Sequence, residues 1–406
     1  MLSRRARLCN RAGTRHNGGV SEAPSTAEDQ ADAAAAAGRA AEARRLLEAA
    51  VQETPERAPA WLKLAAMCRA GGDLQAGLAA VGRALAIDPL DFSALLSKAA
   101  MLERMGRTGE AGQAYGHALA QRPPAEKLPA ALAGAIAHAE AAYRRYQAQS
   151  VALLAAAIPE DAGLDPDERR RAERFCTNFA RVTKPYGQEP SHFHYPGLPP
   201  VEFHDRAHFP WLAALEAGWV DVKAEFEALL ASEAAELVPY VQYPEDVPLA
   251  QWRELNWSRE WTAIHLLQNG RQVERNARHC PKTLALLAGT SQPDVPGRCP
   301  NAMFSLLAPH TRIPPHTGVA NTRLVCHLPL IVPPDCGFRV GAETRAWVPG
   351  EAFVFDDTIE HEAWNESDEL RVVLIFDVWA WALSAAERRA IAAVMAQSDA
   401  PTSEGL

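Results

Sequence analysis

The stretch IPPHTGVANTRLVCHLPL, residues 313–330, is typical of β-structure that carries polar side chains at chosen points. His316 stands before a Thr-Gly pair at the expected end of one strand, and Arg323 and His327 are four residues apart in the next. Residues four apart share a face of a regular strand. Iron sites with two histidines and one carboxylate place the acid two residues after such a histidine, where this chain has Gly318. Either His316 is no ligand, or its site lacks the carboxylate.

The surrounding sequence predicts a β-rich C-terminal domain. Strand-forming segments alternate with turn signals, which is typical of an antiparallel sandwich or barrel. The segments are residues 302–308, 322–332, 337–348, 351–355 and 370–379. The last, LRVVLIFDVW, is almost continuously apolar and is predicted to be a central strand. We expect a double-sheet jelly roll, also described as a double-stranded β-helix or cupin-like fold, with flanking helices. Its mouth is a common place for a metal and a small molecule.

A second group of polar residues adds candidates to this domain. The segment FDDTIEHEAWN, residues 355–365, contains His361, and Arg371 begins the most apolar strand. A buried guanidinium needs an anion, so Arg371 is expected to bind a ligand or to pair with an aspartate. His316 and His361 form a candidate metal pair, although histidines at strand ends are more often hydrogen-bonded core residues. Ser305 is a further candidate.

The N-terminal part contains an internal repeat. Glycines and prolines recur at intervals of 34 residues, at Gly38, Gly72 and Gly106 and at Pro55, Pro89 and Pro123. A period of 34 resembles that of tetratricopeptide helix–turn–helix units. The units are predicted at 24–57, 58–91 and 92–125, the first opening with a capping box from Ser25 to Glu28. A helical cap is expected over 126–182, a disordered leader over 1–23, the β-rich domain with its flanking helices over 183–397 and a disordered tail over 398–406.

Composition limits the possible classes of protein. The chain has 406 residues and a formal charge of −9, which argues against nucleic-acid binding. Its seven cysteines are scattered without a CxxC pair, which favours free thiols in a reducing compartment. No apolar run approaches the roughly 18 residues that span a bilayer. We therefore expect a cytoplasmic protein; a targeting role for the basic N-terminal segment is the alternative.

Residues 305–379 resemble the catalytic domain of the aspartyl/asparaginyl β-hydroxylases. The resemblance rests on three segments, PHTGVANTRLVCHL, ETRAWVPGEAFVFDDTIEHEAWN and RVVLIFDVW. Weaker similarity extends it over roughly residues 183–384. Mammalian members of this family also carry tetratricopeptide repeats ahead of the catalytic domain. The resemblance implies a dioxygenase that depends on iron(II) and 2-oxoglutarate, consumes O₂, uses ascorbate as a possible reductant and hydroxylates the β-carbon of Asp or Asn in a peptide or protein.

The same resemblance implies roles for individual residues. Iron(II) would be held by His316 and His361, and glycine at 318 is the family's usual residue. His327 would bind the C1 carboxylate of 2-oxoglutarate, while Arg371 and Ser305 would bind the distal one. Arg323 would bind the substrate carboxylate. Position 325 is Val where mammalian members have a basic residue, which leaves the substrate open. If Gly318 faces the metal, Gly318→Asp is expected to complete the triad and tighten iron binding.

Two other interpretations remain. In the first, the repeats form a scaffold for a partner protein and the β domain binds a metal or ligand without hydroxylating anything. In the second, a zinc site is built from four histidines around the segment HDRAH, namely His192, His194, His204 and His208. Iron content and succinate release would separate the first from the oxygenase interpretation.

Overall fold

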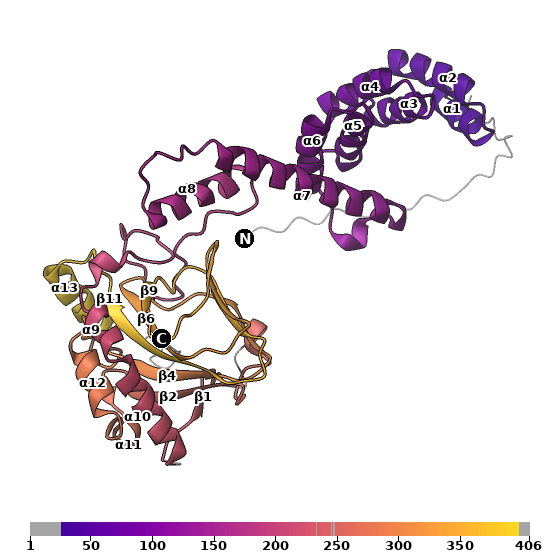
Figure 1. Cartoon of the computed structure of the whole chain (residues 1–406). Helices are drawn as coiled ribbons and strands as arrows, with labels where there is room; N and C mark the ends of the chain where they lie inside the picture. Colours follow the sequence, from indigo (N-terminus) through magenta and orange to yellow (C-terminus); the bar gives the residue numbers. More distant parts are fainter. Residues whose placement is uncertain (1–25, 233, 245, 247, 398–406) are drawn as a thin grey trace, which may run out of the picture. The chain divides into compact units, whose positions relative to one another are not determined.

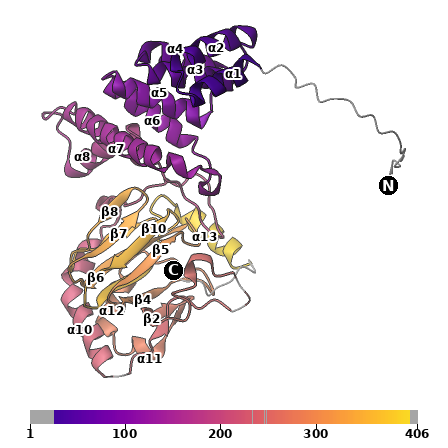
Figure 2. The same ribbon diagram turned by 90° about the vertical axis from the view of Figure 1, so that its right-hand side faces the viewer.

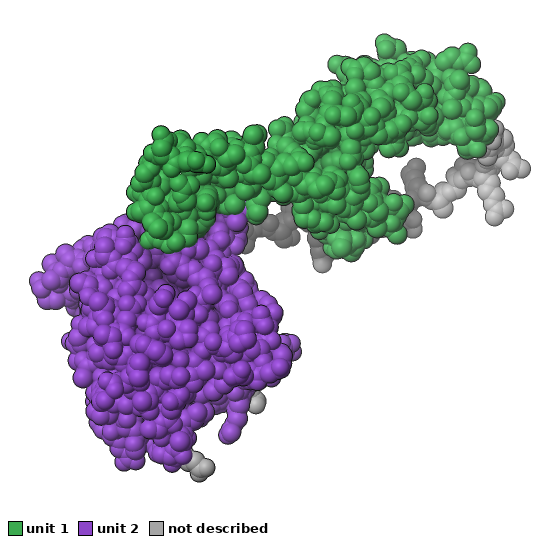
Figure 3. Space-filling model, in the orientation of Figure 1, with its two compact units in different colours: residues 1–182 green, residues 183–406 purple. Residues whose placement is uncertain are grey.

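The computed structural model describes residues 26–232, 234–244, 246 and 248–397. The predicted leader (1–23), the predicted tail (398–406) and Ser25 lie outside these ranges. The chain divides into two compact units, residues 1–182 and residues 183–406, which are coloured separately in Figure 3.

The first unit contains three consecutive helix pairs (Figure 1). They are α1 (Ala27–Ala36) with α2 (Ala40–Glu53), α3 (Ala58–Ala70) with α4 (Leu74–Ile87), and α5 (Phe92–Arg104) with α6 (Thr108–Ala120). The glycines of the 34-residue period occupy the turn inside each pair, with φ of 74° at Gly38, 80° at Gly72 and 74° at Gly106. These left-handed conformations cost glycine little. The predicted tetratricopeptide-like repeats are confirmed.

The N-terminal cap of α1 lies one residue later than predicted. Thr26 accepts a hydrogen bond from the Asp29 backbone N–H through its hydroxyl, at 3.2 Å, and the Thr26 backbone N–H donates to the Asp29 carboxylate, at 3.0 Å. The pair therefore forms a capping box with Asp at its third helical position. Ser25, the first residue of the predicted box, lies outside the described residues, and the carboxylate of Glu28 contacts Arg57 and Lys63.

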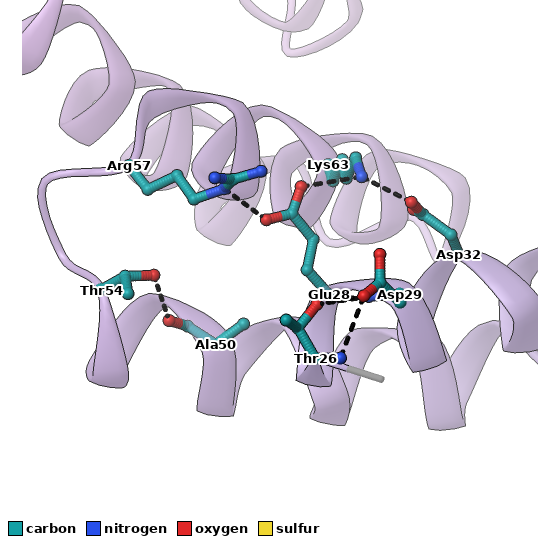
Figure 4. Close-up of polar contacts among 8 residues, drawn as sticks. All are labelled: Thr26, Glu28, Asp29, Asp32, Ala50, Thr54, Arg57 and Lys63. Carbon is teal, nitrogen blue, oxygen red and sulfur yellow. Dashed lines mark hydrogen bonds and ion pairs between the residues drawn. The ribbon is translucent and has the colours of Figure 1, made fainter. Parts of the chain in front are cut away.

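Glu28 joins the first repeat to the second, as Figure 4 shows. Its carboxylate accepts a hydrogen bond from Arg57 at 2.6 Å and lies 2.8 Å from the ammonium of Lys63. Lys63 in turn donates to Asp32 at 2.6 Å. Hydrogen bonding to Lys63 lowers the pKa of Glu28 against the opposing effect of burial. The network thus fixes α1 against α3 through charge as well as through apolar packing.

Two further helices follow the repeats. After the short 3₁₀ turns η1 (Ala125–Lys127) and η2 (Ala130–Leu132), the chain forms α7 (Ala133–Ala156) and α8 (Pro166–Phe179). Tyr143 and Tyr146 of α7 lie against Gly116 and Gly112 of α6, and a Cβ at either glycine would overlap the facing ring. Glycines one turn apart on α6 therefore create the groove that receives α7, so α7 caps the last repeat.

The second unit is built around two antiparallel sheets (Figure 2). The seven-stranded sheet has the order β1-β2-β4-β11-β6-β9, with β3 paired to β2, and the four-stranded sheet has the order β5-β10-β7-β8. The first contains β1 (Val238–Pro239), β2 (Trp261–Gln268), β3 (Arg271–Gln272), β4 (Ala302–Leu307), β6 (Arg323–Ile331), β9 (Phe353–Phe355) and β11 (Arg371–Trp379). The second contains β5 (Thr311–His316), β7 (Cys336–Val340), β8 (Glu343–Arg345) and β10 (His361–Asn365). The predicted β-rich domain is confirmed.

Two apolar cores follow from the alternation of side chains along the strands. Leu374 and Phe376 of β11 pack with Phe226 of α10 (Trp219–Ala231) on the outer face of the larger sheet. Val373 and Ile375 of the same strand pack into the space between the two sheets. β11 pairs with β4 on one side and β6 on the other, and every residue in it is buried, so it is the central strand that the sequence predicted.

Helices surround the larger sheet. They are α9 (Leu212–Ala217), α10 (Trp219–Ala231), α11 (Glu274–Ala277), α12 (Pro281–Ala288) and α13 (Ala385–Met395), with 3₁₀ turns η3 (Arg206–His208) and η4 (Ala250–Trp252). Side chains from α9, α10, α12 and α13 join the outer core, and Figure 1 shows these helices beside the larger sheet. The helices therefore do not cover the inner face of this sheet, where the cavity described below lies.

Among the residues that the structure describes, no helix combines the length and the apolar character needed to cross a membrane.

Candidate functional site

A cavity of about 340 Å³ opens between the two sheets of the second unit. Five of the residues singled out from the sequence line it. His316 ends β5 and His361 begins β10, while Ser305, His327 and Arg371 come from β4, β6 and β11. Strands far apart in the sequence therefore bring these side chains together.

His316 and His361 face each other across one end of the cavity. The strand register pairs the two residues directly, and their ring centroids lie 4.0 Å apart. The Nδ1 of His316 lies 2.7 Å from the carbonyl oxygen of Pro314, and that of His361 lies 3.0 Å from the carbonyl oxygen of Ile359. A carbonyl oxygen only accepts, so each Nδ1 carries the proton and each Nε2 keeps its lone pair.

Burial keeps both rings neutral. It lowers the pKa of His316 to about 4. Burial, with a smaller contribution from His316, holds the pKa of His361 well below its usual value. Neutral imidazoles that present Nε2 lone pairs are the form of histidine that binds metals. The two rings could therefore hold one divalent ion between them.

His327 has the opposite tautomer. The indole Nε1–H of Trp347 donates to its Nδ1 at 3.2 Å. Indole nitrogen is only a donor, so Nδ1 of His327 carries the lone pair and Nε2 carries the proton. Burial, and then the neighbouring Arg371, keeps the pKa of His327 well below its usual value. The neutral ring therefore presents an N–H donor, which suits a carboxylate oxygen rather than a metal.

Arg371 also lines the cavity, and it lacks an anionic partner among the described residues. Its side chain is among the largest fully enclosed ones, and its Nη1 donates to the carbonyl and hydroxyl oxygens of Ser305 at 3.3 and 3.4 Å. Its guanidinium lies 5.0 Å from the centroid of the Trp347 ring, and its buried Nε has no hydrogen-bond partner. Burial lowers the pKa of Arg371 to about 10. A buried cation with an unused donor fits a ligand carboxylate.

Arg323 has a different environment from the one expected. It does not line the cavity, and its Nη1 lies 3.2 Å from the carboxylate of Asp357. Both groups are buried, and their alignment gives an ion pair without a hydrogen bond. Burial opposes the charge on Arg323, but Asp357 and then Asp377 outweigh it and raise the pKa of Arg323. The expected role of Arg323 as a clamp for the substrate is thus not supported by its position.

Gly318 also differs from expectation. The carboxylate of Asp357 occupies the space into which a side chain at position 318 would extend. The amide N–H of Gly318 donates to the backbone carbonyl of Asp357 at 2.7 Å, which fixes the two residues against each other. The expectation that Gly318→Asp would complete a metal triad is wrong, because the new side chain would collide with a buried acid.

The four histidines around HDRAH do not form a zinc site. The Nδ1 of His204 accepts a hydrogen bond from the Trp381 indole at 3.1 Å, and the His208 ring stacks on the same indole with centroids 3.7 Å apart. His192 lies beside the Ser191 hydroxyl at 2.9 Å. No group of three or more His, Cys, Asp or Glu side chains suited to a metal occurs in the described part of the chain. The zinc interpretation therefore fails.

The sequence alone did not reveal Trp347 and Asp357 as parts of the site. Trp347 contacts both His327 and Arg371, and Asp357 lines the cavity beside Gly318. Trp347 lies in the segment ETRAW and Asp357 in FDD, both within the motifs quoted above, yet nothing in their spacing shows which way they point. The aromatic residues Tyr240, Trp252 and Trp261 of the cavity wall were missed for the same reason.

Comparison with known proteins finds similarity within this unit. Residues 216–380 match the model of the Aspartyl/Asparaginyl beta-hydroxylase family. The Rhizobium tropici ornithine lipid ester-linked acyl 2-hydroxylase is 36% identical over 184 residues, which are 45% of this chain and 60% of that protein. The mouse aspartyl/asparaginyl beta-hydroxylase is 32% identical over 186 residues, 46% of this chain and 25% of that protein. Human aspartate beta-hydroxylase domain-containing protein 2 is 33% identical over 213 residues, 52% of this chain and 55% of that protein.

These matches span between a quarter and 60% of the length of the relatives. Similar solved structures include the Arabidopsis OM64 TPR domain, at 19% identity and a TM-score of 0.26 over 30% of this chain and 93% of that one. The Aspergillus fumigatus Sgt2 TPR domain matches at 18% identity and a TM-score of 0.27, over 37% of this chain and 95% of that one.

Proposed function

We propose that this chain, in which residues 216–380 match the aspartyl/asparaginyl β-hydroxylase family model and follow tetratricopeptide-like repeats, is a hydroxylase dependent on iron(II) and 2-oxoglutarate. The observation that carries the proposal is that three histidines in one cavity adopt two different tautomers. His316 and His361 present Nε2 lone pairs, and His327 presents an N–H. Two metal ligands and a carboxylate donor are what such a reaction needs from the protein.

The residues fit the implied cofactors. The Nε2 atoms of His316 and His361 would hold iron(II), with no third protein ligand. His327 would donate to the carboxylate of 2-oxoglutarate beside the metal. Arg371 would bind the distal carboxylate, for which its planar fork and its unused Nε are suited. The hydroxyl of Ser305, which already accepts from Trp261 at 3.1 Å and from Arg371, would assist there.

When bound, the iron and 2-oxoglutarate supply the oxidising chemistry: O₂ and 2-oxoglutarate are consumed, succinate and CO₂ leave, and one C–H bond of the substrate becomes C–OH. Ascorbate is the expected external reductant. The protein's own contribution is orientation. Backbone carbonyls fix the two ligand rings, Trp347 fixes the donor ring, and the enclosed Arg371 defines how deeply the cosubstrate enters.

We further propose that the two sheets form a double-stranded β-helix, the jelly-roll fold expected from the sequence. The strands from β4 to β11 support this, because successive strands alternate between the sheets except for the adjacent pair β7 and β8, giving the orders β4-β11-β6-β9 and β5-β10-β7-β8. Each sheet therefore combines early and late strands, as two interlocked Greek keys require. The cavity then lies in the mouth of the roll, a usual position for ligands.

The proposed substrate is a peptide or protein hydroxylated at the β-carbon of an Asp or Asn residue, and the repeats are proposed to recruit the substrate or a partner protein. Solenoid repeats generally present extended concave surfaces to such ligands. A lipid acyl chain is a second candidate substrate. It is favoured by the similarity to the acyl 2-hydroxylase from Rhizobium tropici and by apolar side chains such as Ile313, Val325 and Ile375 in the cavity wall.

The test is removal of either proposed ligand from the full chain. We expect His316→Ala and His361→Ala to abolish succinate release and to lose manganese(II) binding, measured by electron paramagnetic resonance. His310→Ala is the matched control, because His310 is exposed and forms an ion pair with the exposed Asp368. Manganese binding at the level of the natural protein in both ligand variants would remove the metal centre, and the scaffold interpretation without hydroxylation would then stand.

A further inference from the structure

The cavity wall contains few charged groups. Among the described residues that line it, Arg371 is the one cation besides the histidines, and Asp357 is the one acid. The hydrogen bonds of the three histidines leave each ring with one N–H and one lone pair, as in neutral imidazole. A ligand with two separate anionic groups thus meets a single permanent cation.

Under the proposed function, that cation is already used. Arg371 is buried in the cavity wall and would bind the distal carboxylate of 2-oxoglutarate. Arg323, the other buried arginine nearby, contacts Asp357 and does not reach the cavity surface. A substrate carboxylate would therefore be buried without a cationic partner on the protein, which is strongly unfavourable.

The wall next to the histidine pair is aromatic and apolar. The Trp252 ring lies 5.0 Å from that of His316, and Trp261 lies 6.4 Å from it. Tyr240 stacks on Trp261 with centroids 3.7 Å apart. Val325 adds an aliphatic surface from β6, on the same wall as His327. This surface favours an uncharged group beside the metal ligands.

Polar but uncharged side chains complete the same cavity. Ser191, Gln242 and Gln251 bring a hydroxyl and two amides to its lining. Amides both donate and accept, as peptide groups do, so they match the backbone of a polypeptide better than they match a hydrocarbon chain. The chain also contains a unit of helical repeats, an architecture that generally binds proteins.

From these observations we propose that the group presented for hydroxylation is an uncharged side chain of a polypeptide, and that the site discriminates against aspartate and other anionic side chains. The inference rests on the proposed function, because it assigns Arg371 to the cosubstrate. It narrows the substrate from Asp or Asn to residues without charge, with asparagine as the polar example.

The experiment compares three pools of random peptides that differ only in a fixed central residue, Asn, Leu or Asp. Each pool is equilibrated with the full chain loaded with manganese(II) and 2-oxoglutarate without oxygen, and the bound fraction is measured. The same pools are then hydroxylated with iron(II) and analysed by mass shift. Vesicles of acyl phospholipid form a fourth arm. Binding is measured independently of turnover, so a failure of hydroxylation does not conceal a failure of recognition.

We expect the Asn or the Leu pool to bind on the order of tenfold or more tightly than the Asp pool, since an unpaired buried carboxylate is costly. Val325→Arg should reverse that order by adding a cation to the wall. Val394→Arg, on an exposed position of α13, is the matched control and should leave the order unchanged.

Equal or tighter binding of the Asp pool by the natural protein would overturn the inference, whatever Val325→Arg does. Hydroxylation of the vesicles with no binding of any peptide pool would overturn it too, because the substrate would then be a lipid. Absence of succinate release with every substrate, together with absence of manganese binding, would instead contradict the proposed function. The two failures are therefore distinguishable.

Discussion

The molecule buries two arginines close to its candidate site, and their surroundings differ. Arg323 lies beside Asp357 at 3.2 Å and also feels the charge of Asp377, so its pKa is raised despite burial. Arg371 has Ser305 and the face of Trp347 as neighbours, no carboxylate that bonds to it, and a pKa that burial lowers to about 10.

This difference indicates that Arg323 stabilises the fold, whereas Arg371 is available to bind a ligand. A buried cation that pairs with anions of the protein is neutralised by them, and it stabilises the strands and loops that carry those anions. A buried cation without such an anion is costly in the unliganded state. A ligand that brings a carboxylate offsets this cost. Arg371, which has no carboxylate partner among the described residues, therefore indicates the binding site, whereas Arg323 does not.

The largest expected effect concerns Arg323. Arg323→Ala leaves the buried carboxylates of Asp357 and Asp377 without their cation, and removing one partner of a buried pair costs about 3–5 kcal/mol. We expect a loss of that order in the free energy of unfolding, measured by urea denaturation of the full chain. Arg312→Ala, which removes an exposed ion pair with Glu366, should cost far less. Equal losses for the two variants would contradict the structural assignment of Arg323.

Arg371→Ala should affect ligand binding more than stability. Losing a buried charge partner costs roughly 2–5 kcal/mol, so the Kd for 2-oxoglutarate should rise by about 30-fold or more. The measurement is calorimetric titration of 2-oxoglutarate into the manganese-loaded protein. The free energy of unfolding without ligand should fall less than in Arg323→Ala. An unchanged Kd would show that Arg371, like Arg323, is structural.

The free energy of unfolding is expected to depend on pH through Asp357, the buried partner of Arg323. Burial raises its pKa from 3.8 to about 7, against the opposing effect of Arg323. The folded state therefore binds a proton that the unfolded state releases, so this group reduces stability as pH rises between about 4 and 7, by up to about 1.4 kcal/mol per pH unit. Asp357→Asn should flatten the stability profile in that range. A profile of unchanged slope in urea denaturation at successive pH values would contradict it.

Trp347→Phe should give the smallest effect of these substitutions. It tests whether the surroundings of Arg371 support the binding of 2-oxoglutarate. Phenylalanine keeps an aromatic face for Arg371 but loses the indole N–H that fixes the tautomer of His327. One hydrogen bond contributes about 0.5–1.5 kcal/mol. We expect the Kd for 2-oxoglutarate to rise by up to about tenfold, while manganese affinity stays the same. A fall in manganese affinity instead would mean that Trp347 supports the histidine pair rather than His327.

The parts of the fold that depend on local pattern could be predicted. The period of 34 identified the helix pairs because its glycines act within each repeat, as Gly72 does in the turn between α3 and α4. The continuous apolar run of β11 identified the central strand because only a strand covered on both faces tolerates it. His316, His327, His361 and Arg371 were found because polar residues inside buried strands require an explanation.

The roles of Arg323 and Gly318 could not be predicted in the same way. Arg323 and His327 have the spacing of one strand face, yet only His327 reaches the cavity, because Asp357 from the turn before β10 meets Arg323 at the start of β6. The direction of a side chain at Gly318 is likewise set by that turn, about 40 residues away in the chain. Such contacts between distant segments leave no periodic signal in the sequence.

We propose that Arg371 binds the distal carboxylate of 2-oxoglutarate and that His316 and His361 bind the metal. The most direct test is an anaerobic crystal structure of the full chain with manganese(II) and 2-oxoglutarate. We predict the metal on the Nε2 atoms of His316 and His361 and the distal carboxylate on the guanidinium of Arg371, with Arg323 still paired to Asp357. A carboxylate bound to Arg323, or a metal bound away from the two histidines, would contradict the account.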